Sequence, residues 1–295
     1  MIRAPIPAFV AALLLHVFLF TSATQMPTVP PKNQSATSDY DRGDQLIQEQ
    51  KYEAALPLMK SACNGGEMRG CTSLGMMYKH GLSVATGYNQ AAALFRKACD
   101  GSEPAGCNNL ANMYFQGQGV PKDIPQAVAF FRKACDAGDS LSCNNLGAMY
   151  THGVGIATDD VQGANFFRKA CDAGEMESCD SLGSMYDLGN GVTKDFTQAV
   201  TLYGKACDAK YAPACSDLGE MYGEGNGVAQ DNSKAQTLFS SACDAGDMHG
   251  CVDLGIMYER GIGVTKDRAK AASLYKKACD SGFSFGCDYL KRLQP

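Results

Sequence analysis

The apolar and polar residues of this chain follow a helical period that is interrupted at regular intervals. Within residues 88–123, one apolar set recurs at i, i+3, i+4 and i+7: Ala91, Leu94, Phe95 and Ala98. A second set shows the same spacing: Cys107, Leu110, Ala111 and Tyr114. Each set lies on one face of a helix, so the pattern predicts two amphipathic helices in this segment.

Residues typical of turns separate the two predicted helices. Asp100 and the glycine after it end the first helix, and Pro104 suits the first turn of the second, where no N–H partner is lost. In other units the glycine comes one place later, as a left-handed C-terminal cap requires: Gly138, Gly174, Gly246 and Gly282. Gly117 and Gly119 end the second helix, and Asp123 is placed to cap the next one.

This hairpin repeats every 36 residues, and the cysteines mark the period. The 14 cysteines form seven pairs whose members stand eight residues apart: Cys63 and Cys71, Cys99 and Cys107, Cys135 and Cys143, Cys171 and Cys179, Cys207 and Cys215, Cys243 and Cys251, and Cys279 and Cys287. A fixed period of this length is typical of a stacked repeat protein. We therefore predict an all-α solenoid of seven hairpins over residues 52–295, with an N-terminal capping helix over 39–51.

Each cysteine pair is placed to form a disulfide within its own hairpin. The first cysteine lies in the last turn of one predicted helix and the second in the first turn of the next. An antiparallel turn brings these ends together, and a Cα separation near 5.5 Å suits a disulfide. A disulfide that closes a nine-residue loop restricts the unfolded chain and so adds about 2.5 kcal/mol to the free energy of unfolding, on the entropic model.

Two positions of the repeat carry small residues. The first is in the first helix: Ala55, Ala91, Ala127, Gly163, Ala199, Ala235 and Ala271. The second is in the second helix: Gly75, Ala111, Gly147, Gly183, Gly219 and Gly255. Packed helices lie about 8–10 Å apart, and small residues at a crossing permit the near end of that range.

The first residues are typical of a secretory signal peptide, predicted over 1–23. Arg3 supplies a positive charge, residues 8–20 are apolar, and Thr21-Ser22-Ala23 offers a cleavage site. A retained anchor is the alternative, although the stretch is short for a membrane span. Residues 24–38 read as a flexible linker. Export agrees with the even cysteine count, so we expect a periplasmic or secreted protein that does not enter the membrane after cleavage.

The charge balance narrows the possible partners. The net charge is −5 with 19% charged residues, so no basic surface for nucleic acid or an anionic membrane is expected. We expect a soluble monomer without a cofactor.

Several segments resemble a known repeat family. Residues 182–186 (Leu-Gly-Ser-Met-Tyr), 189–195 (Gly-Asn-Gly-Val-Thr-Lys-Asp) and 169–172 (Lys-Ala-Cys-Asp) are similar to Sel-one-like repeats, which are TPR-like. Because every repeat carries a cysteine pair, the chain resembles in particular the cysteine-rich branch of this family, the Helicobacter cysteine-rich protein (Hcp) family. This resemblance, over about 39–295, implies a right-handed superhelix of hairpins with internal disulfides. It also implies three activities: an adaptor, a β-lactamase or penicillin-binding protein, or an assembly or chaperone-like factor.

The residues themselves provide little for catalysis. One Ser-x-x-Lys segment exists, Ser273 to Lys276, but the Ser-Asp-Asn and Lys-Thr-Gly elements that a penicillin-binding enzyme needs are absent. His80 and His152 lie two repeats apart, too far to share a metal ion. The cysteine spacing does not suit a zinc site or a redox dithiol. We therefore predict no catalytic residue and no metal site.

The polar face of the second helices is the candidate binding surface. In one unit it carries Asn109, Asn112 and Gln116 at i, i+3 and i+7, and Asn145 and His152 take equivalent places in the next. Later units are acidic or mixed at these positions: Asp217, Glu220, Glu224, Asp253 and Arg260. An asparagine amide can both donate to and accept from a peptide backbone, and we expect these amides to be exposed. We predict that Asn109, Asn112, Gln116, Asn145 and His152 bind a peptide or partner protein in a concave groove. The alternative is that this face is simply solvated.

Overall fold

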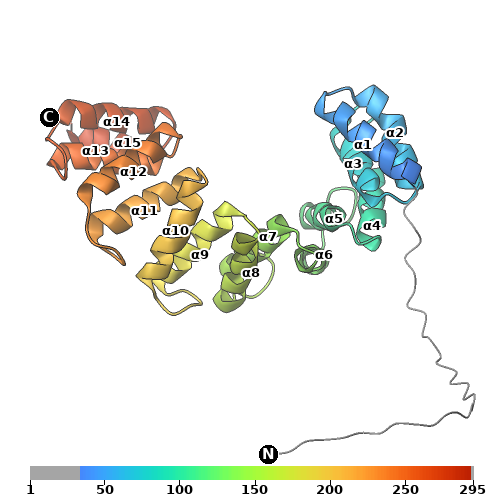
Figure 1. The fold of residues 1–295 in the computed structure, drawn as a ribbon, viewed down its shortest axis with the longest axis horizontal. Coiled ribbons are helices and arrows are strands. Elements are labelled where there is room, and N and C mark those ends of the chain that lie inside the picture. Colours follow the sequence, from blue (N-terminus) through green and yellow to red (C-terminus); the bar gives the residue numbers. More distant parts are fainter. Residues whose placement is uncertain (1–33, 294–295) are drawn as a thin grey trace, which may run out of the picture.

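The computed structural model describes residues 34–293, which form fifteen α-helices and no strand (Figure 1). The helices are α1 (Gln34–Gln48), α2 (Tyr52–Asn64), α3 (Met68–His80), α4 (Tyr88–Asp100), α5 (Pro104–Gln116), α6 (Ile124–Asp136), α7 (Ser140–His152), α8 (Asp160–Asp172), α9 (Met176–Leu188), α10 (Phe196–Asp208), α11 (Ala212–Glu224), α12 (Asn232–Asp244), α13 (Met248–Arg260), α14 (Arg268–Asp280) and α15 (Ser284–Leu293). The predicted all-α solenoid is confirmed. Each even-numbered helix forms a hairpin with the odd-numbered helix that follows it.

The disulfides close each hairpin at its turn, and no described cysteine is unpaired. All seven join cysteines eight residues apart, as the spacing predicts: Cys63 with Cys71, Cys99 with Cys107, Cys135 with Cys143, Cys171 with Cys179, Cys207 with Cys215, Cys243 with Cys251, and Cys279 with Cys287. Their Cα atoms lie 4.5–4.8 Å apart, closer than the 5.5 Å expected. The turn is tight because both cysteines lie within helices rather than in the connection.

The turn residues adopt the backbone conformations that the sequence predicts. The glycines after the first helix have positive φ, from 85° to 95°: Gly138, Gly174, Gly246 and Gly282. Ser102 and Lys210 hold the same left-handed conformation, at 65° and 72°, without the freedom of glycine. Asp123 accepts a hydrogen bond from the N–H of Gln126, so it caps α6 as predicted.

An aromatic ring lies against the backbone of most second helices. A Cβ added to the glycine there would come within 2.5–2.9 Å of the ring of the next first helix, in five pairs: Gly75 with Phe95, Gly147 with Phe167, Gly183 with Tyr203, Gly219 with Phe239, and Gly255 with Tyr275. The small residues therefore leave space for a ring, which explains the close packing predicted for these positions. The buried aromatic side chain joins one hairpin to the next.

A lysine at the end of the first helix also links successive hairpins. Its Nζ donates a hydrogen bond of 2.7–3.0 Å to a cysteine carbonyl of the preceding hairpin, in four pairs: Lys97 to Cys63, Lys133 to Cys99, Lys205 to Cys171, and Lys277 to Cys243. Charge-assisted bonds of this kind satisfy carbonyls that a helix end leaves without a partner. The lysines thus connect the repeats at the disulfide end of the array.

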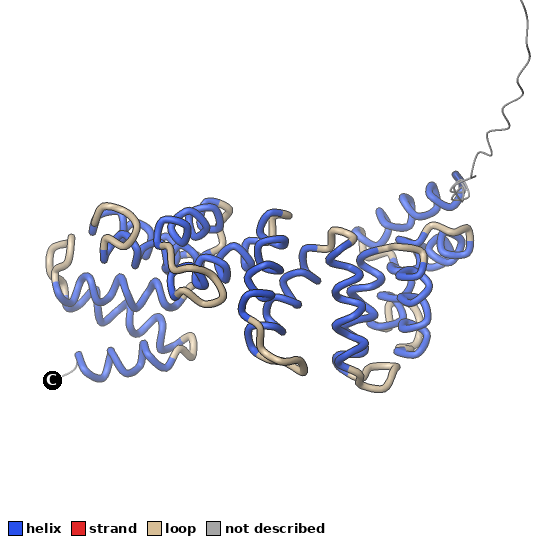
Figure 2. The backbone as a smooth tube through the Cα atoms, turned by 90° about the horizontal axis from the view of Figure 1, so that it is seen from below, coloured by secondary structure: helices blue, strands red, loops and turns tan. Residues whose placement is uncertain are grey.

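The hairpins stack side by side along the long axis of the molecule (Figure 2) and form an open arch (Figure 1). Several pairs of successive odd-numbered helices contact each other: α1 with α3, α3 with α5, α7 with α9, α11 with α13, and α13 with α15. Within residues 34–293 no two successive even-numbered helices approach as closely. A stack of hairpins curves toward the side on which its helices lie nearer, so the odd-numbered helices line the inside of the curve. We call the surface carried by α3, α5, α7, α9, α11, α13 and α15 the inner face.

The first helix differs from its predicted boundary. Helix α1 begins at Gln34, so its first turn lies inside the predicted linker of residues 24–38. The predicted signal peptide, 1–23, and the linker up to residue 33 lie outside the described residues. None of the helices between residues 34 and 293 combines the length and the apolarity that a membrane span requires.

Candidate functional site

Three pockets lie on the inner face, between successive odd-numbered helices. The asparagine pocket, of about 200 Å³, lies between α5 and α7. The central pocket, of about 460 Å³, lies between α7, α9 and α11. The C-terminal pocket, of about 170 Å³, lies between α11, α13 and α15. The inner face therefore carries a series of hollows along the array, and its second helices supply most of the lining.

The asparagine pocket brings together three of the five residues predicted to bind. Asn112, Asn145 and His152 line it, whereas Asn109 and Gln116 are not among its lining residues. Its floor is apolar, formed by residues that include Phe115, Phe131, Ala148, Met149 and Val154. The sequence indicated the polar residues through their repeat positions. It did not indicate the apolar floor, which three helices and a loop supply together.

The two asparagines of α5 that were predicted to bind use their amide donors inside the helix. The Asn109 Nδ2 donates to the carbonyl of Ala105 at 2.8 Å, and the Asn112 Nδ2 donates to the carbonyl and side-chain oxygens of Asn108. Both side chains are half-buried rather than exposed, because their amides turn back onto the preceding turn of the helix. A bound peptide would therefore meet mainly the acceptor oxygens of these amides.

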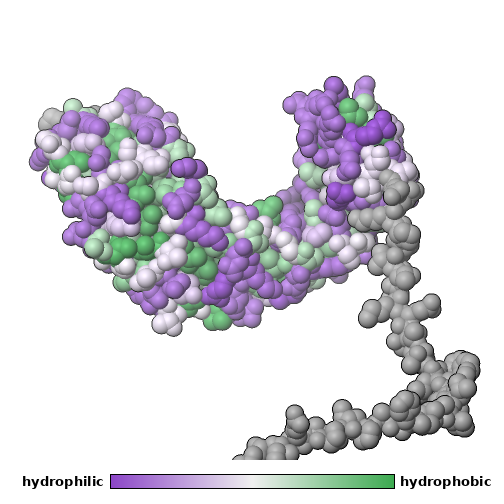
Figure 3. Space-filling view, viewed as in Figure 1, coloured by the Kyte–Doolittle hydropathy of each residue, from purple (hydrophilic) through white to green (hydrophobic). Residues whose placement is uncertain are grey.

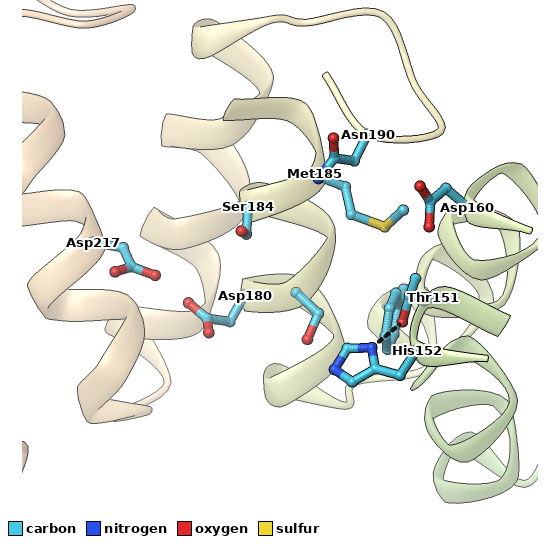
Figure 4. Close-up of a pocket in the computed structure, with 10 residues that line it drawn as sticks. Thr151, His152, Asp160, Asp180, Ser184, Met185, Asn190 and Asp217 are labelled. Atoms are coloured by element: carbon cyan, nitrogen blue, oxygen red, sulfur yellow. Dashed lines mark hydrogen bonds between the residues drawn. The ribbon is translucent and has the colours of Figure 1, made fainter. Parts of the chain in front are cut away.

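The central pocket contains two carboxyl groups that face each other (Figure 4). Asp180 projects from α9 and Asp217 from α11, and the two groups are close enough to shift each other's pKa values. On the other side of the pocket, the Thr151 hydroxyl lies 2.9 Å from the Nδ1 of His152. No Lys or Arg within residues 34–293 forms an ion pair with either carboxyl group.

Burial raises the pKa values of these acids. Burial, and then the charge of Asp180, raise the pKa of Asp217 to about 7. Burial likewise raises the pKa of Asp180 to about 6, against the opposing effect of the neighbouring Asp217 carboxyl group. In both cases Asp247, which caps α13, adds a further negative charge. The pair therefore prefers to hold a proton near neutral pH.

Replacing Asp217 by Asn is expected to stabilise the protein more at pH 8 than at pH 5. The pKa of Asp217 lies above the value of about 3.9 in an unfolded chain. The stability that this group contributes is therefore complete below pH 4 and is lost as the pH rises through about 7. Asn keeps the shape without the charge, so the gain in unfolding free energy should grow by about 1–3 kcal/mol from pH 5 to pH 8.

Urea unfolding of both proteins at the two pH values measures this difference. Asp208→Asn, at the exposed end of α10, removes the same charge elsewhere and should show no such growth. A gain for Asp217→Asn that is equal at pH 5 and pH 8 would contradict the raised pKa.

The C-terminal pocket combines aromatic rings with carboxyl groups. Phe283, Phe285 and Tyr289 line it from the last hairpin, and Glu220 and Asp253 line it from α11 and α13. Burial first, and then the charge of Glu220, raise the pKa of Asp253 to about 7. The sequence had indicated Glu220 and Asp253, because they occupy the same repeat positions as the polar residues Asn112 and Asn109. It did not indicate the aromatic residues, because the last hairpin departs from the pattern of the others.

The described residues offer no constellation for catalysis. Ser273 is exposed on α14, and the Nζ of Lys276 pairs with Asp280 at 2.7 Å rather than with the serine hydroxyl. Within residues 34–293 no group of three or more His, Cys, Asp or Glu side chains is placed to hold a metal ion.

The chain matches the model of the Sel1 repeat six times. The matches cover residues 69–102, 104–139, 140–175, 177–211, 212–247 and 249–283. Together they span well over half of the chain, in register with the helices described above. No curated protein matches the sequence.

Solved structures with the same architecture include a protective antigen, c5321, present in uropathogenic Escherichia coli strains and displaying an SLR fold. It is 29% identical with a TM-score of 0.78, and the match covers 88% of this chain and 56% of that one. A Sel1 repeat protein from Oxalobacter formigenes is 24% identical with a TM-score of 0.71, and the match covers 81% and 96%. Helicobacter pylori cysteine-rich protein B is 32% identical over 44% of this chain and 93% of that one, with a TM-score of 0.37. The chain thus spans little more than half the length of the E. coli antigen.

Proposed function

The chain belongs to the Sel1 repeat family, and we propose that it is an exported scaffold that binds a segment of a partner protein along its inner face. Sel1 repeats generally mediate protein–protein interactions. The observation that carries the proposal is the row of three pockets between successive odd-numbered helices. All three open on one face of the array.

The dimensions of the array suit an extended polypeptide. Neighbouring packed helices lie about 8–10 Å apart, and an extended chain advances about 3.3–3.6 Å per residue. A bound segment would therefore place roughly every third residue at the next repeat. Side chains of that segment would enter the pockets, and the half-buried Asn112 and Asn145 would supply acceptors for its backbone N–H groups.

The disulfides support the proposed export. Seven disulfides persist in an oxidising compartment and would be reduced in most cytosols. The periplasm or the cell exterior is therefore the compartment that suits this chain.

Selection of peptides tests the binding surface directly. A phage-displayed peptide library is selected on oxidised residues 24–295, and calorimetry measures the Kd of the peptides obtained. We expect the double variant Asn112→Ala with Asn145→Ala to weaken them about 10-fold or more, because each lost hydrogen bond contributes about 0.5–1.5 kcal/mol and leaves a partner unsatisfied. Gln126→Ala, an exposed amide on α6, is the matched control and should leave the Kd unchanged. Equal affinity for all three proteins would remove the asparagine pocket from the binding surface.

A further inference from the structure

The C-terminal pocket has an aromatic side that is open to solvent. Phe285 belongs to the last hairpin of the array, and its side chain is 59% exposed. The Phe283 ring lies 5.5 Å from the Phe285 ring and 4.6 Å from the His249 ring. Terminal repeats normally present a polar outer surface, because no neighbour covers them. An exposed phenylalanine beside a pocket therefore needs an explanation other than packing.

The pocket is also lined by two acidic side chains with which no Lys or Arg of the described chain forms an ion pair. These are Glu220 from α11 and Asp253 from α13. Burial, and then the charges of Asp217 and Glu224, raise the pKa of Glu220, against a smaller opposing effect of His249. A half-buried carboxylate without a cationic partner costs free energy, which a bound cation would recover.

We infer that the C-terminal pocket binds the cationic side chain of a lysine or arginine in the partner polypeptide. The inference rests on the proposed function, since the pocket lies on the inner face. An ammonium or guanidinium group is attracted to the face of an aromatic ring and to a carboxylate, and this pocket offers both. An anion would be repelled by Glu220 and Asp253. An apolar side chain would bury the charges of these two residues without a partner.

The size and surroundings of the pocket favour a side chain of a polypeptide over a small molecule. Its volume of about 170 Å³ is below the roughly 300–1,000 Å³ of small-molecule sites. The facing carboxyl groups of Asp180 and Asp217 lie next to it along the inner face, on α9 and α11. Apolar side chains also gather over α9–α12, while the arm of α1–α4 is mostly hydrophilic at its surface (Figure 3). A basic segment would thus meet acceptors on α9, α11 and α13 in succession.

The test uses a hexa-arginine peptide, capped at both ends, and its hexa-citrulline counterpart, which has nearly the same shape without the charge. Both are titrated calorimetrically into oxidised residues 24–295 at pH 8 and 150 mM NaCl, where long-range attraction is largely screened. The double variant Glu220→Gln with Asp253→Asn removes the charges, and Phe285→Leu removes one ring from an exposed position. Asp208→Asn with Asp244→Asn removes two exposed charges from α10 and α12 and is the matched control.

We expect the arginine peptide to bind and the citrulline peptide to bind at least 10-fold more weakly. The loss of both pocket charges should weaken the arginine peptide about 10-fold or more, Phe285→Leu about 3- to 5-fold, and the control less than 2-fold. An equal loss in the control would show general electrostatic attraction and overturn the inference, as would the absence of binding. Library peptides that depend on Asn112 and Asn145 but not on Glu220 and Asp253 would overturn this inference alone and leave the proposed function standing.

Discussion

Reduction of the seven disulfides is expected to abolish the helical array at 37 °C. Each disulfide closes a nine-residue loop and contributes about 2.5 kcal/mol on the entropic model. The loss of three or four such links already approaches the roughly 5–15 kcal/mol by which a domain is normally stable. The helices cannot compensate, because most have 13 residues and isolated helices of that length are marginal in water.

Circular dichroism of the oxidised protein, and of the protein reduced and alkylated, measures the effect. A matched pair of double variants separates local from global loss: Cys171→Ala with Cys179→Ala in the middle of the array, and Cys279→Ala with Cys287→Ala at its end. Both central cysteines are buried, with neighbours on each side, so the central variant should lower the melting temperature more. A reduced protein that keeps its helical signal with an unchanged melting temperature would show that packing alone holds the array.

The fold was predictable because every repeat carries the same information. The 36-residue period, the apolar spacing and the cysteine pairs all indicate one hairpin, and the structure confirms both the hairpins and the pairing. The start of α1 was less predictable. It lies beside polar residues and a proline-containing segment, where no repeat supplies a template.

The sites were less predictable than the fold, because their residues do not occupy equivalent positions of the 36-residue repeat. Asp180 and Asp217 are 37 residues apart, so they occupy different places in the repeat, and only the folded array brings them to one pocket. The lysine bonds to cysteine carbonyls were missed for a related reason, since a lysine near a helix end first suggests a solvated charge. Comparison of equivalent positions detects what repeats. Contacts between different positions require the structure.

Gly219→Leu is expected to destabilise the protein by about 3 kcal/mol or more. A Cβ at residue 219 would lie 2.7 Å from the Phe239 ring, which is buried between α11 and the next hairpin. Overpacking of a filled core normally costs about 1–3 kcal/mol, and a leucine adds further carbons beyond that first clash. Ala111 occupies the equivalent position in an earlier hairpin and is fully buried beside Phe131, so Gly219→Ala should cost far less.

Three further variants make the cause of this loss testable. Gly204→Leu, in α10, places the same side chain where no atom lies within 4 Å of the new Cβ, so it should be tolerated. Phe239→Ala alone should destabilise by about 3–5 kcal/mol through the cavity that it leaves. Combined with Gly219→Leu, however, it should recover part of that loss, because the leucine fills the space of the ring and the two effects are not additive. Chemical unfolding of the four proteins measures the coupling. Strictly additive losses would show that Gly219 is required for a reason other than the ring that lies against it.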